Sequence, residues 1–167
     1  MAKKLLFEEI LGRAGALLDE GSEDDPRTAT VLQVALAEVY EDLGAYDAAI
    51  LYQEQALEAY RGTLGEEDPG TLAVRNKLGN LLQEQGRLSE AEPHYLEALA
   101  ISRRTLGEEH RRTLDLIGGL GLLYAAQGKM HEAEPLYLKA MEGRRRLLGD
   151  LDPDTLTAIG NMGWLLR

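Results

Sequence analysis

The residues best suited to acid–base or metal chemistry in this chain are three histidines. His94, His110 and His131 are its only histidines. The chain repeats itself every 42 residues, and the three histidines occupy three different positions of that repeat. A metal site needs several ligands that converge on one point, and nothing in this spacing brings the three together. We therefore expect no metal and no cofactor.

Paired carboxylates are the other candidates for catalysis. The pairs Glu66-Glu67 and Glu108-Glu109 lie in polar connectors between apolar stretches. A general acid needs surroundings that raise its pKa, and an exposed connector offers none. We expect no catalytic residues and predict that the chain is not an enzyme.

The run Gly118-Gly119-Leu120-Gly121 has the glycine content of a phosphate-binding loop. A dinucleotide fingerprint also needs a preceding strand and a third glycine, and a P-loop needs Gly-Lys-Ser/Thr. This run lies inside an expected helix, where Gly118 and Gly119 each cost about 1 kcal/mol relative to alanine. Either they admit the backbone of a partner or they are merely tolerated. Alanine at both positions is expected to raise the melting temperature.

Charge and composition limit the partners. The net charge is −11, and residues 1–69 carry all of it, with 16 acidic and 5 basic side chains. This disfavours nucleic acid and anionic membranes and leaves open a basic partner or simple solubility. Cysteine is absent, and no apolar run approaches the ~20 residues of a membrane span. We expect a cytoplasmic protein.

One phrase of the sequence returns at a fixed interval. Leu64-Gly65-Glu66-Glu67 recurs as Leu106-Gly107-Glu108-Glu109, and in altered form from Leu148-Gly149, so that the glycines are 42 residues apart. A period of this length indicates stacked supersecondary units. Within each period, one helical stretch ends at a glycine (44, 86 or 128), and a second runs to the next Leu-Gly. The small and large residues at helical spacing, such as Ala91 and Tyr95, indicate a packed core.

These residues resemble the tetratricopeptide repeat (TPR), whose signature includes L-G-x2-Y followed by A-x3-F. The match is Leu120-Gly121-x2-Tyr124 with Ala133-x3-Tyr137, and the pattern returns from Leu78-Gly79. The 42-residue period is most similar to that of the kinesin light chain subclass. The resemblance implies an all-α, right-handed α-α superhelix (a TPR solenoid) of about eight antiparallel helices.

We predict a single array over residues 1–167. Its parts are a lone N-terminal helix at 3–18, repeats at 27–62, 70–105 and 112–147, and a half repeat at 154–167. An unpaired helix at each end leaves a stacking face open. At the C-terminus that face includes Met162, Trp164, Leu165 and Leu166, so end-to-end self-association into a homodimer is one expectation.

The resemblance also implies a function. The first helices of such repeats line a concave groove in which peptides or helical segments dock, so we expect a protein-interaction scaffold with a protein or peptide ligand. Carried over position by position, the groove residues are Val34, Glu38, Asn76, Lys77, Asn80, Gln83, Asp115, Leu122, Asn161 and Trp164. Asn76 and Asn80 are the best candidates, because an amide side chain can bond a peptide's N–H and C=O at once.

The lining is poor in cations. Lys77 stands nearly alone in it, so the pair of basic residues that clamps a C-terminal carboxylate in such repeats is missing, and acidic ligands are poorly served. The alternative to a scaffold is an engineered or excised array with no ligand of its own.

Overall fold

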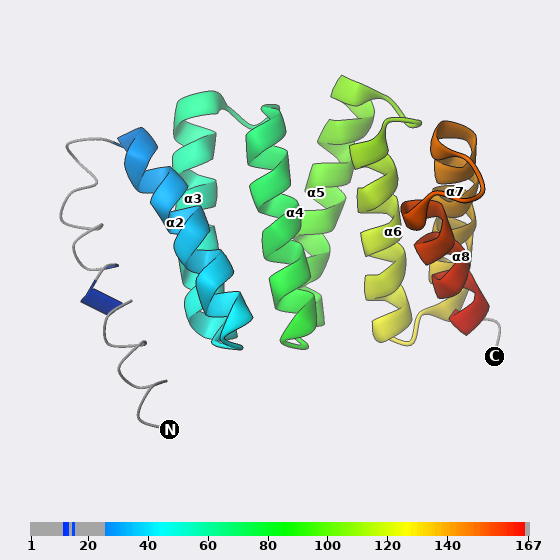
Figure 1. Ribbon diagram of the computed structural model, residues 1–167, viewed down its shortest axis with the longest axis horizontal. Coiled ribbons are helices and arrows are strands. Elements are labelled where there is room, and N and C mark those ends of the chain that lie inside the picture. The colour runs from blue at the N-terminus through cyan, green and yellow to red at the C-terminus, as the bar shows by residue number, and fades with distance from the viewer. Residues whose placement is uncertain (1–11, 14, 16–25, 166–167) are drawn as a thin grey trace. The chain divides into compact units, whose positions relative to one another are not determined.

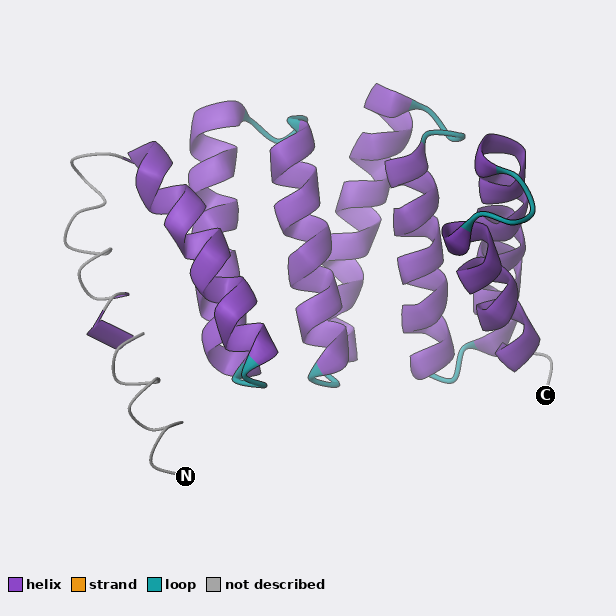
Figure 2. Cartoon of the chain, in the orientation of Figure 1, coloured by secondary structure: helices purple, strands orange, loops and turns teal. Residues whose placement is uncertain are grey.

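The computed structural model describes residues 12, 13, 15 and 26–165, without the side chains of residues 26–28, 154 and 161–165. Within these residues the structure is helices joined by short loops, with no strand (Figures 1 and 2). The helices are α2 (Pro26–Asp42), α3 (Tyr46–Leu64), α4 (Pro69–Glu84), α5 (Leu88–Leu106), α6 (Arg111–Ala126), α7 (Met130–Leu148) and α8 (Pro153–Leu165). The prediction of an all-α repeat array is confirmed. Most of the helix expected at 3–18 lies outside the described residues.

The chain forms two compact units, residues 1–81 and residues 82–167. In the first unit α2 packs against α3, and in the second α5, α6, α7 and α8 pack in sequence. Helix α4 begins in the first unit and ends in the second. The single array over residues 1–167 stays a prediction.

The first helix of each pair ends at a left-handed glycine. At the end of α4, Gly86 has φ +79°. Its N–H bonds the carbonyl of Gln83 at 2.9 Å, and the N–H of Arg87 bonds that of Leu82 at 2.8 Å. The same two bonds recur at Gly44 and Gly128. This is a Schellman motif, which satisfies the last carbonyls of the helix and needs a residue that accepts positive φ.

The repeated Leu-Gly phrase forms the connector after the second helix. Gly107 has φ 91° and ψ 167°, a conformation that is essentially restricted to glycine. Its carbonyl accepts a hydrogen bond of 2.7 Å from the hydroxyl of Thr113, and Thr71 bonds Gly65 at the same distance. Thr155 occupies the corresponding place in the third connector. It is fully buried, but its hydroxyl has no partner among the described residues.

The acidic residue after that glycine pairs with an arginine in the last turn of the preceding helix. Arg103 Nε lies 2.9 Å from Glu108, and Arg61 Nε lies 2.5 Å from Glu66. Arg145 contacts Asp150 in the same way. Hydrogen bonds from Lys139 first, and then Arg103, lower the pKa of Glu108. The connector is therefore closed by bonds between residues five or six apart in the sequence, and Lys139 of α7 adds a long-range bond at Glu108.

The core of the second unit follows the predicted alternation of small and large residues. Ala91 and Ala98 are completely buried, and Tyr95 between them is 1% exposed. Ala133, Tyr137 and Ala140 repeat this pattern in α7. Burial of Tyr95 raises the pKa of its phenol far above the ordinary value, with a smaller contribution from Glu84. The ring is thus a neutral core side chain at any ordinary pH.

Candidate functional site

The outward face of α2 presents side chains that the core of the first unit does not use. Val31 is 62% exposed, Val34 is half-buried, and Glu38 is exposed. Their spacing places all three along one side of the helix. Within the described residues, Glu38 has no ion-pair partner. This part of the predicted groove is therefore apolar at one end and carries a free carboxylate at the other.

The lysine of the predicted groove is already paired. Lys77 Nζ on α4 lies 2.6 Å from a carboxylate oxygen of Glu41 on α2. Both side chains belong to the first unit, and the carboxylate is only 20% exposed. The pair joins two first helices and leaves Lys77 without a free charge for an acidic ligand.

The amide side chains of the predicted groove are less available than the sequence suggested. The amide oxygen of Asn76 is enclosed by protein and has no hydrogen-bond partner in the part of the chain that the structure describes. Asn80 is half-buried. Gln83 uses its amide oxygen inside the second unit, where it accepts a hydrogen bond of 3.1 Å from the hydroxyl of Tyr95.

Of the two predicted groove residues on α6, one is exposed and the other is already bound by an arginine. Leu122 is 39% exposed. Asp115 is held by Arg144 of α7, with 2.9 Å between Oδ1 and Nη2. The Arg144 side chain is 12% exposed. Sequence reasoning missed this arginine, because it belongs to a second helix rather than a groove-lining first helix.

The glycine pair in α6 accommodates side chains of this chain. A Cβ on Gly118 would lie 3.4 Å from Nη2 of Arg144, so the guanidinium rests over the glycine. A Cβ on Gly119 would lie 2.6 Å from Cε1 of Tyr95, which is too close for any atom. In the sequence, the missing side chain at Gly118 was the one indication that the side chain of another helix lies against α6. The expectation that alanine is stabilising at both positions is kept for Gly118 alone.

Two predicted groove residues, Asn161 and Trp164, lie in α8. Their side chains fall outside the described part of the structure, and so do those of Met162, Leu165 and Leu166. The rest of the predicted lining is brought to the first helices α2, α4 and α6.

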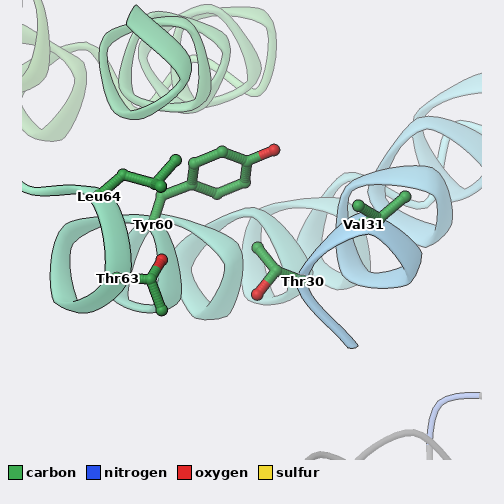
Figure 3. A pocket seen from close by; sticks show the side chains of 5 residues that line it. All are labelled: Thr30, Val31, Tyr60, Thr63 and Leu64. Carbon is green, nitrogen blue, oxygen red and sulfur yellow. The ribbon is translucent and has the colours of Figure 1, made fainter. Parts of the chain in front are cut away.

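A pocket of about 300 Å³ opens in the first unit between the start of α2 and the end of α3. It is lined by Thr30, Val31, Tyr60, Thr63 and Leu64. Figure 3 shows Tyr60 and Leu64 on one side of α3, with the Tyr60 ring extending toward Val31 of α2. The hydroxyl of Thr63 donates to the carbonyl of Ala59 at 2.7 Å, so it is turned to the backbone. The pocket is therefore mainly apolar, and it includes Val31, which lies three residues before Val34 of the predicted groove.

Neither the histidines nor the carboxylates form a chemical centre in the described residues. His110 caps α6 by accepting the N–H of Arg112 at 3.2 Å, His94 is half-buried and His131 is exposed. No group of three or more histidine or acidic side chains there is placed to hold a metal ion. No described helix is both long and apolar enough to cross a bilayer.

Solved structures with similar folds agree with the repeat pattern. BtubC (BKLC) from P. vanneervenii has a TM-score of 0.78 and 26% identity, over 96% of this chain and 66% of that one. A putative kinesin light chain with TPR-like repeats from Podospora anserina has a TM-score of 0.74 and 27% identity, over 80% and 63%. The chain thus spans about two thirds of the length of these proteins. The N-terminal domain of C. elegans stress-induced protein-1 shares the fold at 14% identity and a TM-score of 0.59, over 84% and 96%.

In sequence, no curated protein matches the chain. The family model described as the tetratricopeptide repeat matches residues 27–104, 73–129 and 112–167. These overlapping matches run through all of the helix pairs predicted from the 42-residue period, and the structural neighbours are kinesin light chain-like. The predicted resemblance is confirmed, and the chain belongs to the tetratricopeptide repeat family.

Proposed function

We propose that this chain is a protein-interaction scaffold that binds a peptide or a helical segment through exposed side chains of its first helices. TPR repeats are generally protein–protein interaction modules, and their scaffold is typically non-catalytic. The proposal is supported by the contrast between buried and exposed positions of the helices. The alternating small and large residues that recur with the 42-residue period are buried in the core, whereas Val31, Glu38 and Leu122 are exposed on first helices.

The proposal is tested by selecting binders to the full chain from a displayed library of random dodecapeptides. Replacing Val31 or Leu122 with aspartate is expected to weaken the selected peptides at least about tenfold, because an interface loses an apolar anchor and gains an unpaired charge. The matched controls are Leu51→Asp and Leu138→Asp, which change leucines on second helices that are 51% and 40% exposed. Equal weakening by the control variants, or a selection that yields no peptide, contradicts the proposal.

A second candidate function is self-association through α8. Leu156 and Ile159 are 51% and 43% exposed there. Their counterparts in α6, Leu114 and Ile117, are 1% and 0% exposed. Two apolar residues at positions that are core elsewhere in the array favour a partner surface.

Sedimentation velocity at rising concentration tests this candidate. We expect dimer at high micromolar concentration and its loss in Leu156→Glu/Ile159→Glu, since both changes place charge on the apolar face. A wild-type chain that stays monomeric over this range would remove the candidate.

A further inference from the structure

We propose that the first unit binds a peptide in which an apolar side chain is followed or preceded, three residues away, by lysine or arginine. The apolar side chain enters the pocket beside Val31, and the cation pairs with Glu38. This inference rests on the proposed scaffold function and specifies its ligand.

The pocket suits one apolar side chain. Its volume of about 300 Å³ lies at the lower end of the range for ligand pockets, roughly 300–1,000 Å³. The hydroxyl of Thr63 is committed to the backbone, which leaves Val31, Leu64 and the Tyr60 ring as the main contacts. The ring is supported from behind, because a Cβ on Gly70 would lie 2.7 Å from its Cε1 atom.

The corresponding place in the third repeat is filled. The residues two periods after Val31 and Tyr60 are Asp115 and Arg144. In the third repeat those two side chains form an ion pair with 2.9 Å between Nη2 and Oδ1. The place that an ion pair occupies in the third repeat is lined in the first by valine and tyrosine, and there it stays open.

The charge on α2 determines which kind of residue accompanies the apolar side chain in the peptide. Lys77 is neutralised by Glu41 at 2.6 Å, whereas Glu38 is exposed and unpaired within the described residues. Among the side chains that the structure describes on this face of α2, the free charge is therefore negative. Electrostatic complementarity favours a cation and rejects an acidic residue at the same place.

The spacing follows from helix geometry. Val31 and Glu38 are seven residues apart on one side of α2, which is about 10 Å along a helix that rises 1.5 Å per residue. A peptide in the polyproline II conformation advances about 3.1 Å per residue and completes a turn every three residues, so side chains three residues apart lie on the same face. Three peptide residues therefore cover the distance from the pocket to the carboxylate.

The experiment is a selection from the random dodecapeptide library on three forms of the full chain: wild type, Glu38→Lys and the control Glu54→Lys. Glu54 is an exposed carboxylate on the second helix α3. The wild type and the control are expected to enrich peptides with lysine or arginine three residues from an apolar residue. Glu38→Lys is expected to enrich aspartate or glutamate at that place instead.

A second pair of variants tests the pocket. Val31→Trp fills the pocket with a larger side chain and is expected to abolish the preference for an apolar residue in the peptide. Leu51→Trp, at an exposed position of α3 that does not line the pocket, is expected to leave that preference intact. For one synthetic peptide taken from the enriched clones, Glu38→Gln is expected to weaken binding about threefold to fivefold, as for one exposed ion pair.

The possible outcomes distinguish failure of this inference from failure of the proposed scaffold function. Enriched peptides whose charge does not respond to Glu38→Lys, or that carry acidic residues on the wild type, overturn this inference and leave the scaffold function standing. Absence of any enriched peptide overturns both.

Discussion

Tyr95→Ala is expected to lower the free energy of unfolding by about 3 to 5 kcal/mol, as for other buried aromatic residues replaced by alanine. The Tyr95 side chain is 1% exposed, and its ring fills the space over Gly119. Its hydroxyl also donates to Gln83 at 3.1 Å. Removing the ring leaves a cavity between α5 and α6 and deprives the amide of its partner. Urea denaturation followed by circular dichroism measures the loss.

The contact between Tyr95 and Gly119 makes a sharper test through a double-mutant cycle. In the wild type, Gly119→Ala forces a Cβ to 2.6 Å from a rigid ring. We expect a net loss of about 1 to 2 kcal/mol, because overpacking outweighs the gain of about 1 kcal/mol in helix propensity. In the Tyr95→Ala background the ring is gone, so the same change is expected to stabilise. Such a change of sign is the signature of direct coupling.

Gly118→Ala is the matched control for this cycle. Its Cβ would meet Arg144 at 3.4 Å and Ala140 at 3.8 Å, which is ordinary contact. It is expected to be neutral or stabilising by up to about 1 kcal/mol in both backgrounds. If Gly119→Ala behaves like Gly118→Ala in the wild type, the Tyr95 ring does not lie against the glycine.

Gly107→Ala has the second largest expected effect, a loss of about 2 kcal/mol. At φ 91° and ψ 167° a side chain is strained whatever the space around it, and such conformations cost on the order of 1–3 kcal/mol. The strain acts on the connector whose closure depends on the bond from Thr113 to the Gly107 carbonyl. Thermal unfolding measures the effect.

The control for Gly107→Ala is Gly62→Ala. Gly62 lies inside α3 without a positive φ, and nothing lies within 4 Å of an added Cβ. Alanine is expected to add about 1 kcal/mol of stability there through helix propensity. A Gly107→Ala chain as stable as the wild type would show that the connector adopts another conformation.

Local rules made most of the helices predictable from the sequence. The glycines at 44, 86 and 128 indicate helix ends, because the turn that follows each helix needs a residue with positive φ. The Leu-Gly connectors recur at the same period. Each of these signals lies within a few residues of the boundary that it sets. The predicted repeat at 70–105 and the observed helices α4 and α5, Pro69–Leu106, differ by one residue at either end.

The charges of the candidate site were not predictable in the same way. Lys77 and Glu41 are 36 residues apart, and Arg144 reaches Asp115 across 29 residues. Pairing over such separations depends on which helices pack together and on how far a long side chain extends between them. The groove positions therefore stay a prediction from the sequence, while only the structure shows that Lys77 and Arg144 are already paired with carboxylates.

The connectors have a consequence for how the chain folds. The arginine–carboxylate bonds that close them span five residues, and the threonine bonds to Gly65 and Gly107 span six. Closing such short loops costs little chain entropy, and repeat arrays can begin to order at any unit and spread to its neighbours. Folding of this chain can therefore start at any intact connector. A substitution that disrupts one connector is expected to slow folding there, while the other connectors remain available as starting points.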